Sequence, residues 1–118
     1  MDFVIDVVQT STGGKVIYVS FLDTKDMVHI ILDGVLSRGD RIVAAYCYHN
    51  GEPLWVHAQF LESVREDVRS FCIRILKAIV ERLRPDLMEK ESFQRIQEHE
   101  HIPEMEKAVT EFIDRAPK

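Results

Sequence analysis

The stretch Leu61–Arg84 (LESVREDVRSFCIRILKAIVERLR) decides the fold, because its pattern predicts a long amphipathic helix. Its apolar residues recur at steps of three and four, which places them along one side of a helix. These residues are Leu61, Val64, Val68, Phe71, Cys72, Ile75, Leu76, Ile79, Val80 and Leu83. Pro85 ends the helix, since the residue before a proline avoids the helical region. A stripe this wide needs a sheet or several elements to cover it.

Two pairs of β-rich segments predict two antiparallel hairpins. Phe3–Gln9 and Lys15–Leu22 alternate like half-buried strands around the turn-forming segment Thr10–Gly14. Arg41–Tyr48 and Leu54–Phe60 form the second pair. The sheet is therefore expected to contain four strands.

Asn50-Gly51 predicts a two-residue type I′ turn in the second hairpin, because both central positions of such a turn need positive φ. A turn of this length fixes the register of the two strands. The pairs expected towards the core are Cys47–Leu54, Ala45–Val56 and Val43–Ala58, next to His49–Glu52 at the turn. The pairs expected on the opposite face are Tyr46–Trp55, Ala44–His57 and Ile42–Gln59.

The segment between the hairpins allows two interpretations. Asp23 or Thr24 resembles a helix N-cap, the apolar residues between Met27 and Leu36 follow helical spacing, and Gly39 is a plausible stop. A strand at Val28–Leu32 is the alternative. We expect the helix.

Two further helices are predicted after Pro85. Pro85–Gln97 has a weaker apolar pattern, and Pro103 suits the first turn of a final helix. The expected fold is a single α+β domain over residues 1–118. Its four-stranded antiparallel sheet forms from two hairpins in the order ββαββα, with helices packed on one face and one or two C-terminal helices.

Composition narrows the function classes. No apolar run approaches the roughly 20 residues that span a bilayer, and the start of the chain has no basic segment typical of a secretory signal. Only two cysteines occur, which is typical of a reducing compartment, so we expect a cytoplasmic protein without membrane association. The net charge of −5 argues against nucleic-acid binding and suits a partner with a basic surface.

The aromatic residues divide between the two faces of the expected sheet. All six Phe fall on faces assigned to the core, whereas the three Tyr and the single Trp fall on the outer face. Tyr and Trp combine an apolar body with a polar tip, which suits a surface that a partner covers. The predicted interface residues are Tyr18, Ile42, Tyr46, Tyr48, Trp55 and His57. The alternatives are that the C-terminal helices cover this face or that it is ordinary solvated sheet.

Motifs for chemistry are weak. His99 and His101 could offer metal ligands, but two positions apart on a helix they would point in different directions. Cys47 and Cys72 fall on faces expected to be buried, where a thiol behaves as a small hydrophobe. We therefore expect no catalytic residues, no metal and no cofactor.

The expected function is a non-enzymatic protein-binding or regulatory domain, of the adaptor, immunity or inhibitor type, that acts through the aromatic outer face. A homodimer or another protein would be its partner. The alternative is a small-molecule-binding or enzymatic domain that uses the same face as a pocket floor, with His57 as its polar group.

Overall fold

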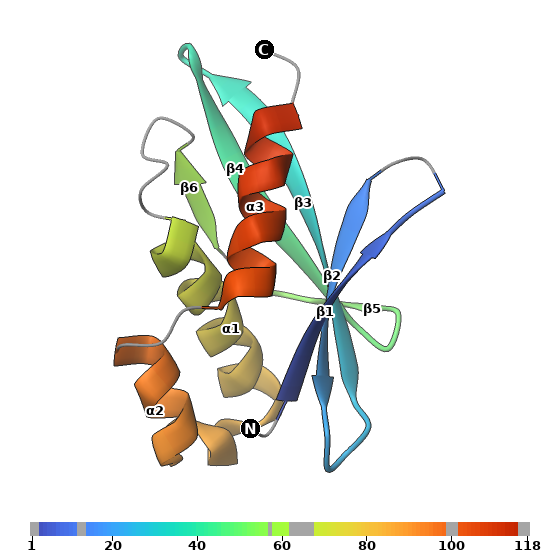
Figure 1. Ribbon diagram of the computed structural model, residues 1–118, viewed down its shortest axis with the longest axis vertical. Helices are drawn as coiled ribbons and strands as arrows, with labels where there is room; N and C mark the ends of the chain where they lie inside the picture. The colour runs from blue at the N-terminus through green and yellow to red at the C-terminus, as the bar shows by residue number, and fades with distance from the viewer. Residues whose placement is uncertain (1–2, 12–13, 57, 62–67, 99–101, 116–118) are drawn as a thin grey trace.

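A computed structural model describes residues 3–11, 14–56, 58–61, 68–98 and 102–115 of the chain (Figure 1). Its secondary structure comprises β1 (Phe3–Gln9), β2 (Lys15–Phe21), β3 (Met27–Ser37), β4 (Asp40–His49), β5 (Glu52–Leu54), β6 (Gln59–Leu61), α1 (Val68–Leu83), the 3₁₀ helix η2 (Pro85–Glu89), α2 (Glu91–Glu98) and α3 (Pro103–Arg115). The fold is α+β, as predicted. None of the described helices has both the length and the apolar composition needed to cross a membrane.

The strands form one antiparallel sheet in the order β1-β2-β3-β4-β5, and β6 also pairs with β4. The helices gather on one face of this sheet (Figure 1). There α3 packs against β1, β2 and α1. The Phe60 and Phe71 rings join β6 to α1 with centroids 4.6 Å apart. The sheet therefore has one face packed into the core and one without a covering helix among the described residues.

The helix expected between Met27 and Leu36 is wrong, because this segment is strand β3. It pairs with β4 from Val28 opposite His49 to Ser37 opposite Asp40. Val28 and Ile30 are fully buried, whereas the alternating residues between and beyond them are not. The apolar residues of this segment fit both helical and strand spacing. Pairing with β2 on one side and β4 on the other favours the strand. The four-stranded sheet and the ββαββα order are wrong for the same reason.

The expected helix ends are turns instead. Asp23 and Thr24 lie in the connection between β2 and β3, which the Phe21 N–H closes by donating to the Asp26 carbonyl oxygen at 2.9 Å. Gly39 follows Arg38 in a two-residue turn between β3 and β4, where φ is 54° at Arg38 and 82° at Gly39. Both turns therefore connect strands that pair antiparallel in the sheet.

The Asn50-Gly51 turn is confirmed, with φ of 51° and 85° at its two central residues. The predicted pairs of His49 with Glu52 and of Cys47 with Leu54 are also confirmed.

Beyond Leu54 the predicted register is wrong by two residues. Val43 pairs with Phe60 instead of Ala58, and the partners of Ile42 and Ala44 shift to Leu61 and Gln59. Likewise the N–H of Ala45 donates to Ala58 and not to Val56. A slip of two keeps every side chain on its face, so the apolar pattern cannot distinguish the two registers.

The amphipathic helix is confirmed for Val68–Leu83, where Phe71, Cys72, Ile75 and Ile79 are fully buried. Its predicted start is wrong, because Leu61 belongs to β6. The expected positions from Glu62 to Asp67 lie outside the described residues. The predicted helix from Pro85 divides into η2 and α2, and Pro103 begins α3 as predicted.

The phenylalanines gather in the core as predicted. Five of them are buried, and Phe112 packs against the core while partly exposed. The ring of Phe3 lies 6.2 Å from that of Phe21 and 6.3 Å from that of Phe93, which ties β1 to β2 and α2.

Arg84, just after α1, links the end of that helix to the β2–β3 turn. Its guanidinium donates to both carboxylate oxygens of Asp23, at 2.5 and 2.8 Å, and to Asp86 at 2.8 Å. It also lies 5.7 Å from the ring centroid of Phe21. The hydrogen bonds from Arg84 are the main cause that lowers the pKa of Asp23 and of Asp86.

We expect Phe71→Ala to lower the free energy of unfolding by about 3–5 kcal/mol, because it removes a fully buried ring and leaves a cavity. Urea denaturation measures the change. Ser70→Ala, on the exposed side of the same helix, is the control and should stay within about 0.5 kcal/mol of the wild type. Equal losses in the two variants would contradict the placement of α1.

We expect Gly51→Val to lower the melting temperature clearly, because a β-branched residue strongly disfavours positive φ. Gly51→Asn should cost less, since Asn tolerates the left-handed region. Thermal unfolding by circular dichroism compares the two. A Val variant as stable as the Asn variant would show that the turn has another conformation.

Acid should weaken the link between Arg84 and Asp23. The folded-state pKa of Asp23 lies below its unfolded value of about 3.9, so its stabilising contribution is present above pH ~4 and is lost as the pH falls through the folded value. We expect the free energy of unfolding of Asp23→Asn to fall less steeply below pH ~4 than that of the wild type. Denaturant titrations between pH 7 and pH 3 measure both slopes, and equal slopes would exclude the link in solution.

Candidate functional site

The side of the sheet away from the helices, here called the outer face, is built by alternation along the strands. Every second residue of each strand points to this side, and the pairing between strands places these residues next to one another. Its described strand residues are Val4, Asp6, Val8, Val16, Tyr18, Ser20, Met27, His29, Ile31, Asp33, Asp40, Ile42, Ala44, Tyr46, Tyr48, Pro53, Gln59 and Leu61.

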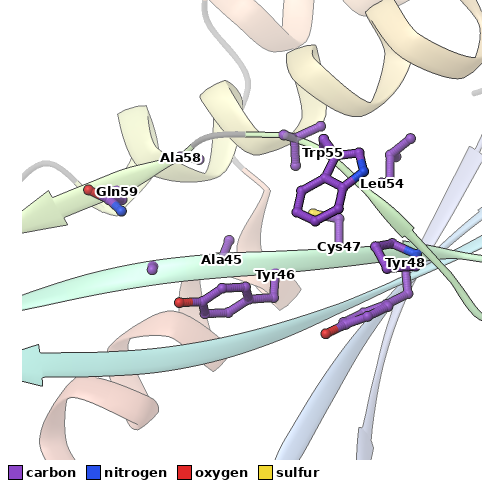
Figure 2. A pocket seen from close by; sticks show the side chains of 11 residues that line it. Ala45, Tyr46, Cys47, Tyr48, Leu54, Trp55, Ala58 and Gln59 are labelled. Carbon is purple, nitrogen blue, oxygen red and sulfur yellow. The ribbon is translucent and has the colours of Figure 1, made fainter.

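Exposed apolar side chains concentrate on the outer face. Trp55 is 71% exposed and Tyr46 47%, and Figure 2 shows them on neighbouring segments, Tyr46 on β4 and Trp55 just after β5. Other large apolar side chains exposed on this face are Val4, Val8, Met27, Ile31 and Leu61. Of the described residues in this class, only Leu22 lies elsewhere, in the β2–β3 turn. The described C-terminal helices lie on the other side of the sheet and do not cover this surface (Figure 1).

The structure brings most of the predicted interface residues together. Tyr18 comes from β2, and Ile42, Tyr46 and Tyr48 come from β4. Trp55 directly follows β5. His57 lies outside the described residues.

A row of three rings crosses the middle of the outer face. His29 stacks on Tyr48 with centroids 5.1 Å apart and planes 14° apart, and Tyr18 lies 6.0 Å from His29 on the other side. The register causes this row, since Tyr18 pairs with His29 and His29 with Tyr48. The predicted interface did not include His29, because the segment was expected to be a helix. The alternative strand at Val28–Leu32 would have placed His29 in the sheet.

A hollow of about 220 Å³ opens beside Tyr46, Tyr48 and Trp55 (Figure 2). Its lining includes the small residues Ala44, Ala45 and Ala58 together with Tyr46 and Trp55. Small side chains leave space that the larger aromatic residues border. This arrangement can receive one compact apolar group or a short side chain.

A bulge in the edge strand produces the hollow. Cys47 pairs with Leu54, whereas the N–H of Ala45 donates to the carbonyl oxygen of Ala58, so the chain from Leu54 to Ala58 is longer than the part of β4 that it faces. Such a bulge bends a strand and redirects its side chains. Here the bend follows Leu54 and begins at Trp55.

Two arginines of α1 hold the bulged segment at its ends. Arg82 donates to the carbonyl oxygen of Trp55, and Arg74 donates to that of Gln59 at 2.8 Å. Each satisfies a backbone acceptor with a charged donor, which is stronger than a neutral hydrogen bond. The position of Trp55 therefore depends on α1 as well as on the sheet.

The charge of the outer face has one sign. Its described strand residues include Asp6, Asp33 and Asp40 but neither Lys nor Arg. An apolar area with acidic residues around it complements a surface that carries basic side chains.

Cys47 and Cys72, the two thiols considered for chemistry, are buried. Burial raises the pKa of the Cys47 and Cys72 thiols to about 12, so neither is a thiolate nucleophile at neutral pH. His49 lies 3.0 Å from Asp26 and joins the end of β4 to the start of β3. No group of three or more His, Cys, Asp or Glu suited to a metal occurs in the described part of the chain, and His99 and His101 fall outside it.

Comparison with protein-family models, with curated proteins and with solved structures finds no match to this chain. The candidate site therefore stands on its geometry and charge alone.

Proposed function

We propose that this chain is a non-enzymatic, cytoplasmic protein-binding domain that acts through its outer face. The observation that carries the proposal is the gathering of exposed apolar side chains on the sheet face opposite the core. Single exposed apolar residues are common, but a contiguous patch on a folded domain marks a contact surface. Trp and Tyr are the residue types most enriched at the energetic centres of such contacts.

The dimensions of the outer face support this role. The four longer strands have seven to eleven residues each. With strands about 4.8 Å apart and a rise of about 3.3 Å per residue, their projected area is roughly 500 Å² before side-chain relief. A standard interface covers about 800 Å² on each partner, so the face can supply most of one.

A second copy of the chain is the first partner to consider, because closed twofold dimers are the commonest assemblies. The acidic residues around the apolar area favour a partner with basic side chains, which a second copy would have to bring from outside its own outer face. An adaptor, immunity or inhibitor protein would use such a surface to hold one target.

The alternative is a small-molecule site in the hollow beside Trp55. The hollow supports it because small residues line it between aromatic ones. Its volume of about 220 Å³ is below the range of about 300–1,000 Å³ typical of ligand pockets. Protein binding is therefore the stronger proposal.

A double substitution tests the outer face. We expect Tyr46→Ser with Trp55→Ser to leave the fold intact, because both side chains are largely exposed. If the wild type self-associates, sedimentation equilibrium should show its dimer dissociating at least ten-fold more readily in the variant, since such residues contribute about 2 kcal/mol or more each. If the wild type is a monomer, the variant should lose a protein partner that the wild type retains in a pull-down.

Leu22→Ser provides a matched control, because Leu22 is 59% exposed but lies in the β2–β3 turn. It should leave association unchanged. A folded double variant with the mass and partners of the wild type would refute the role of the outer face. An unfolded double variant would show instead that the side chains of Tyr46 and Trp55 belong to the core.

A further inference from the structure

The two edges of the sheet differ. β1 forms one edge and, among the described strands, pairs only with β2. At the other edge β5 and β6 have three residues each, are separated by the bulge, and include Pro53, which lacks an N–H. Short strands, bulges and prolines are the usual devices that prevent a further strand from pairing. β1 runs for seven residues without any of these devices.

The register shows which peptide groups of β1 point away from β2. The Thr10 N–H donates to Gly14 at 2.8 Å and continues the β1–β2 pairing, so Val8, Asp6 and Val4 follow as the hydrogen-bonded positions. The remaining positions, Phe3, Ile5, Val7 and Gln9, direct their N–H and C=O groups to the free edge.

Phe21 of β2 gives an independent check. Its N–H donates towards β3, to Asp26, although Phe21 pairs with Phe3 of β1. The Phe3–Phe21 pair is therefore not hydrogen-bonded, and Phe3 points its peptide groups outward. Alternation extends this direction to Ile5, Val7 and Gln9.

Two hollows lie along this strand, each with α3 as a wall. The first, about 330 Å³, borders Phe3 and Ile5 on β1, Ile96 on α2, and Ile102 with the start of α3. The second, about 420 Å³, borders Asp6, Val7 and Gln9 on β1 and the next turns of α3. Glu104 borders both, so the two hollows lie next to each other along β1.

The two hollows differ in chemistry. The first is lined mainly by apolar side chains. The second has the carboxylates of Asp6, Glu104 and Glu111 against the ammonium groups of Lys15 and Lys107. Lys15 and Glu111 already form an ion pair, which leaves two carboxylates and one ammonium group there. A basic side chain is thus the better complement of the second hollow.

We propose that β1 and α3 bind an extended segment of a partner protein, which adds to the sheet as a strand beside β1. Its main chain pairs antiparallel with the outward peptide groups of Phe3, Ile5, Val7 and Gln9. A large apolar side chain enters the first hollow, and a Lys or Arg enters the second. Main-chain pairing supplies affinity in such complexes, and the pockets for alternate side chains supply specificity. This surface adjoins the outer face at β1, where Asp6 borders both, but the inference does not rest on the function proposed for the outer face.

A peptide with the sequence of Lys15–Phe21 (KVIYVSF) is a suitable probe, because this segment already pairs antiparallel with β1 in the fold. In a similar register at the free edge, its Phe would meet the first hollow and its Lys the second. The probe is acetylated, amidated and N-methylated at the residues matching Val16, Tyr18 and Ser20, which blocks the edge turned away from β1. The control peptide has further N-methyl groups at the residues matching Ile17 and Val19, which block the pairing edge.

Each peptide is titrated into the ¹⁵N-labelled full chain, and the shifts of the amide NMR signals measure its affinity and its binding site. We expect the probe to shift the amide signals of β1 and α3 but not that of Tyr46. The control should bind at least ten-fold more weakly, since it loses two main-chain hydrogen bonds to β1. Val7→Pro should also weaken binding of the probe, because it removes an outward N–H and preserves pairing with β2.

Several results would overturn the proposal. Equal affinity for the two peptides would exclude main-chain pairing, and shifts confined to the outer face would place binding there. Absence of any shift at about 1 mM probe would show that the edge does not accept a strand. Shifts of the β1 amides that grow with protein concentration alone would show that a second copy occupies the edge. If Val7→Pro fails to fold, the peptide pair still decides.

Discussion

Burial of the α1 stripe against the sheet is the interaction on which the rest of this structure depends. Phe71, Ile75 and Ile79 have no exposed surface, and each fully buried side chain of this size contributes about 1.5–3 kcal/mol. The same contact selects one face of the sheet as the core. Because strands alternate, every residue of the opposite parity is then directed away from the helices. The outer face is therefore a consequence of how α1 packs, and its composition is open to selection for binding.

That composition is unusual for a solvated sheet. An antiparallel sheet with one packed face normally alternates apolar residues inside with polar ones outside. Here Val4, Val8 and Ile31 occupy outward positions beside the ring row of Tyr18, His29 and Tyr48. Replacing the three aliphatic residues with polar ones would leave the core contacts of the fold unchanged. Their presence at these positions is consistent with the covering partner proposed above.

Much of this arrangement could be predicted from the sequence, and the failures have identifiable causes. Asn50-Gly51 and the α1 stripe are strong local signals, because each depends on residues a few positions apart. Met27–Ser37 contains apolar residues at both helical and strand spacing, so only its pairing with β2 and β4 decides its structure. Gly34 of β3 makes room for Arg41, whose Cδ would lie 2.7 Å from an added Cβ. The two-residue shift in register after Leu54 could not be predicted from the apolar pattern, because it moves residues along the sheet without changing the face to which they point.

The two proposed surfaces meet at β1, and this has a thermodynamic consequence. Val4 and Val8 belong to the outer face, while the peptide groups of Ile5 and Val7, which alternate with them, point to the free edge. A strand added at that edge would extend the outer face by about 4.8 Å and bring its own outward side chains beside Val4 and Val8. A partner on the outer face would then contact the added strand as well. Binding at the two surfaces would therefore be coupled, and by linkage each partner would change the affinity of the other by the same factor.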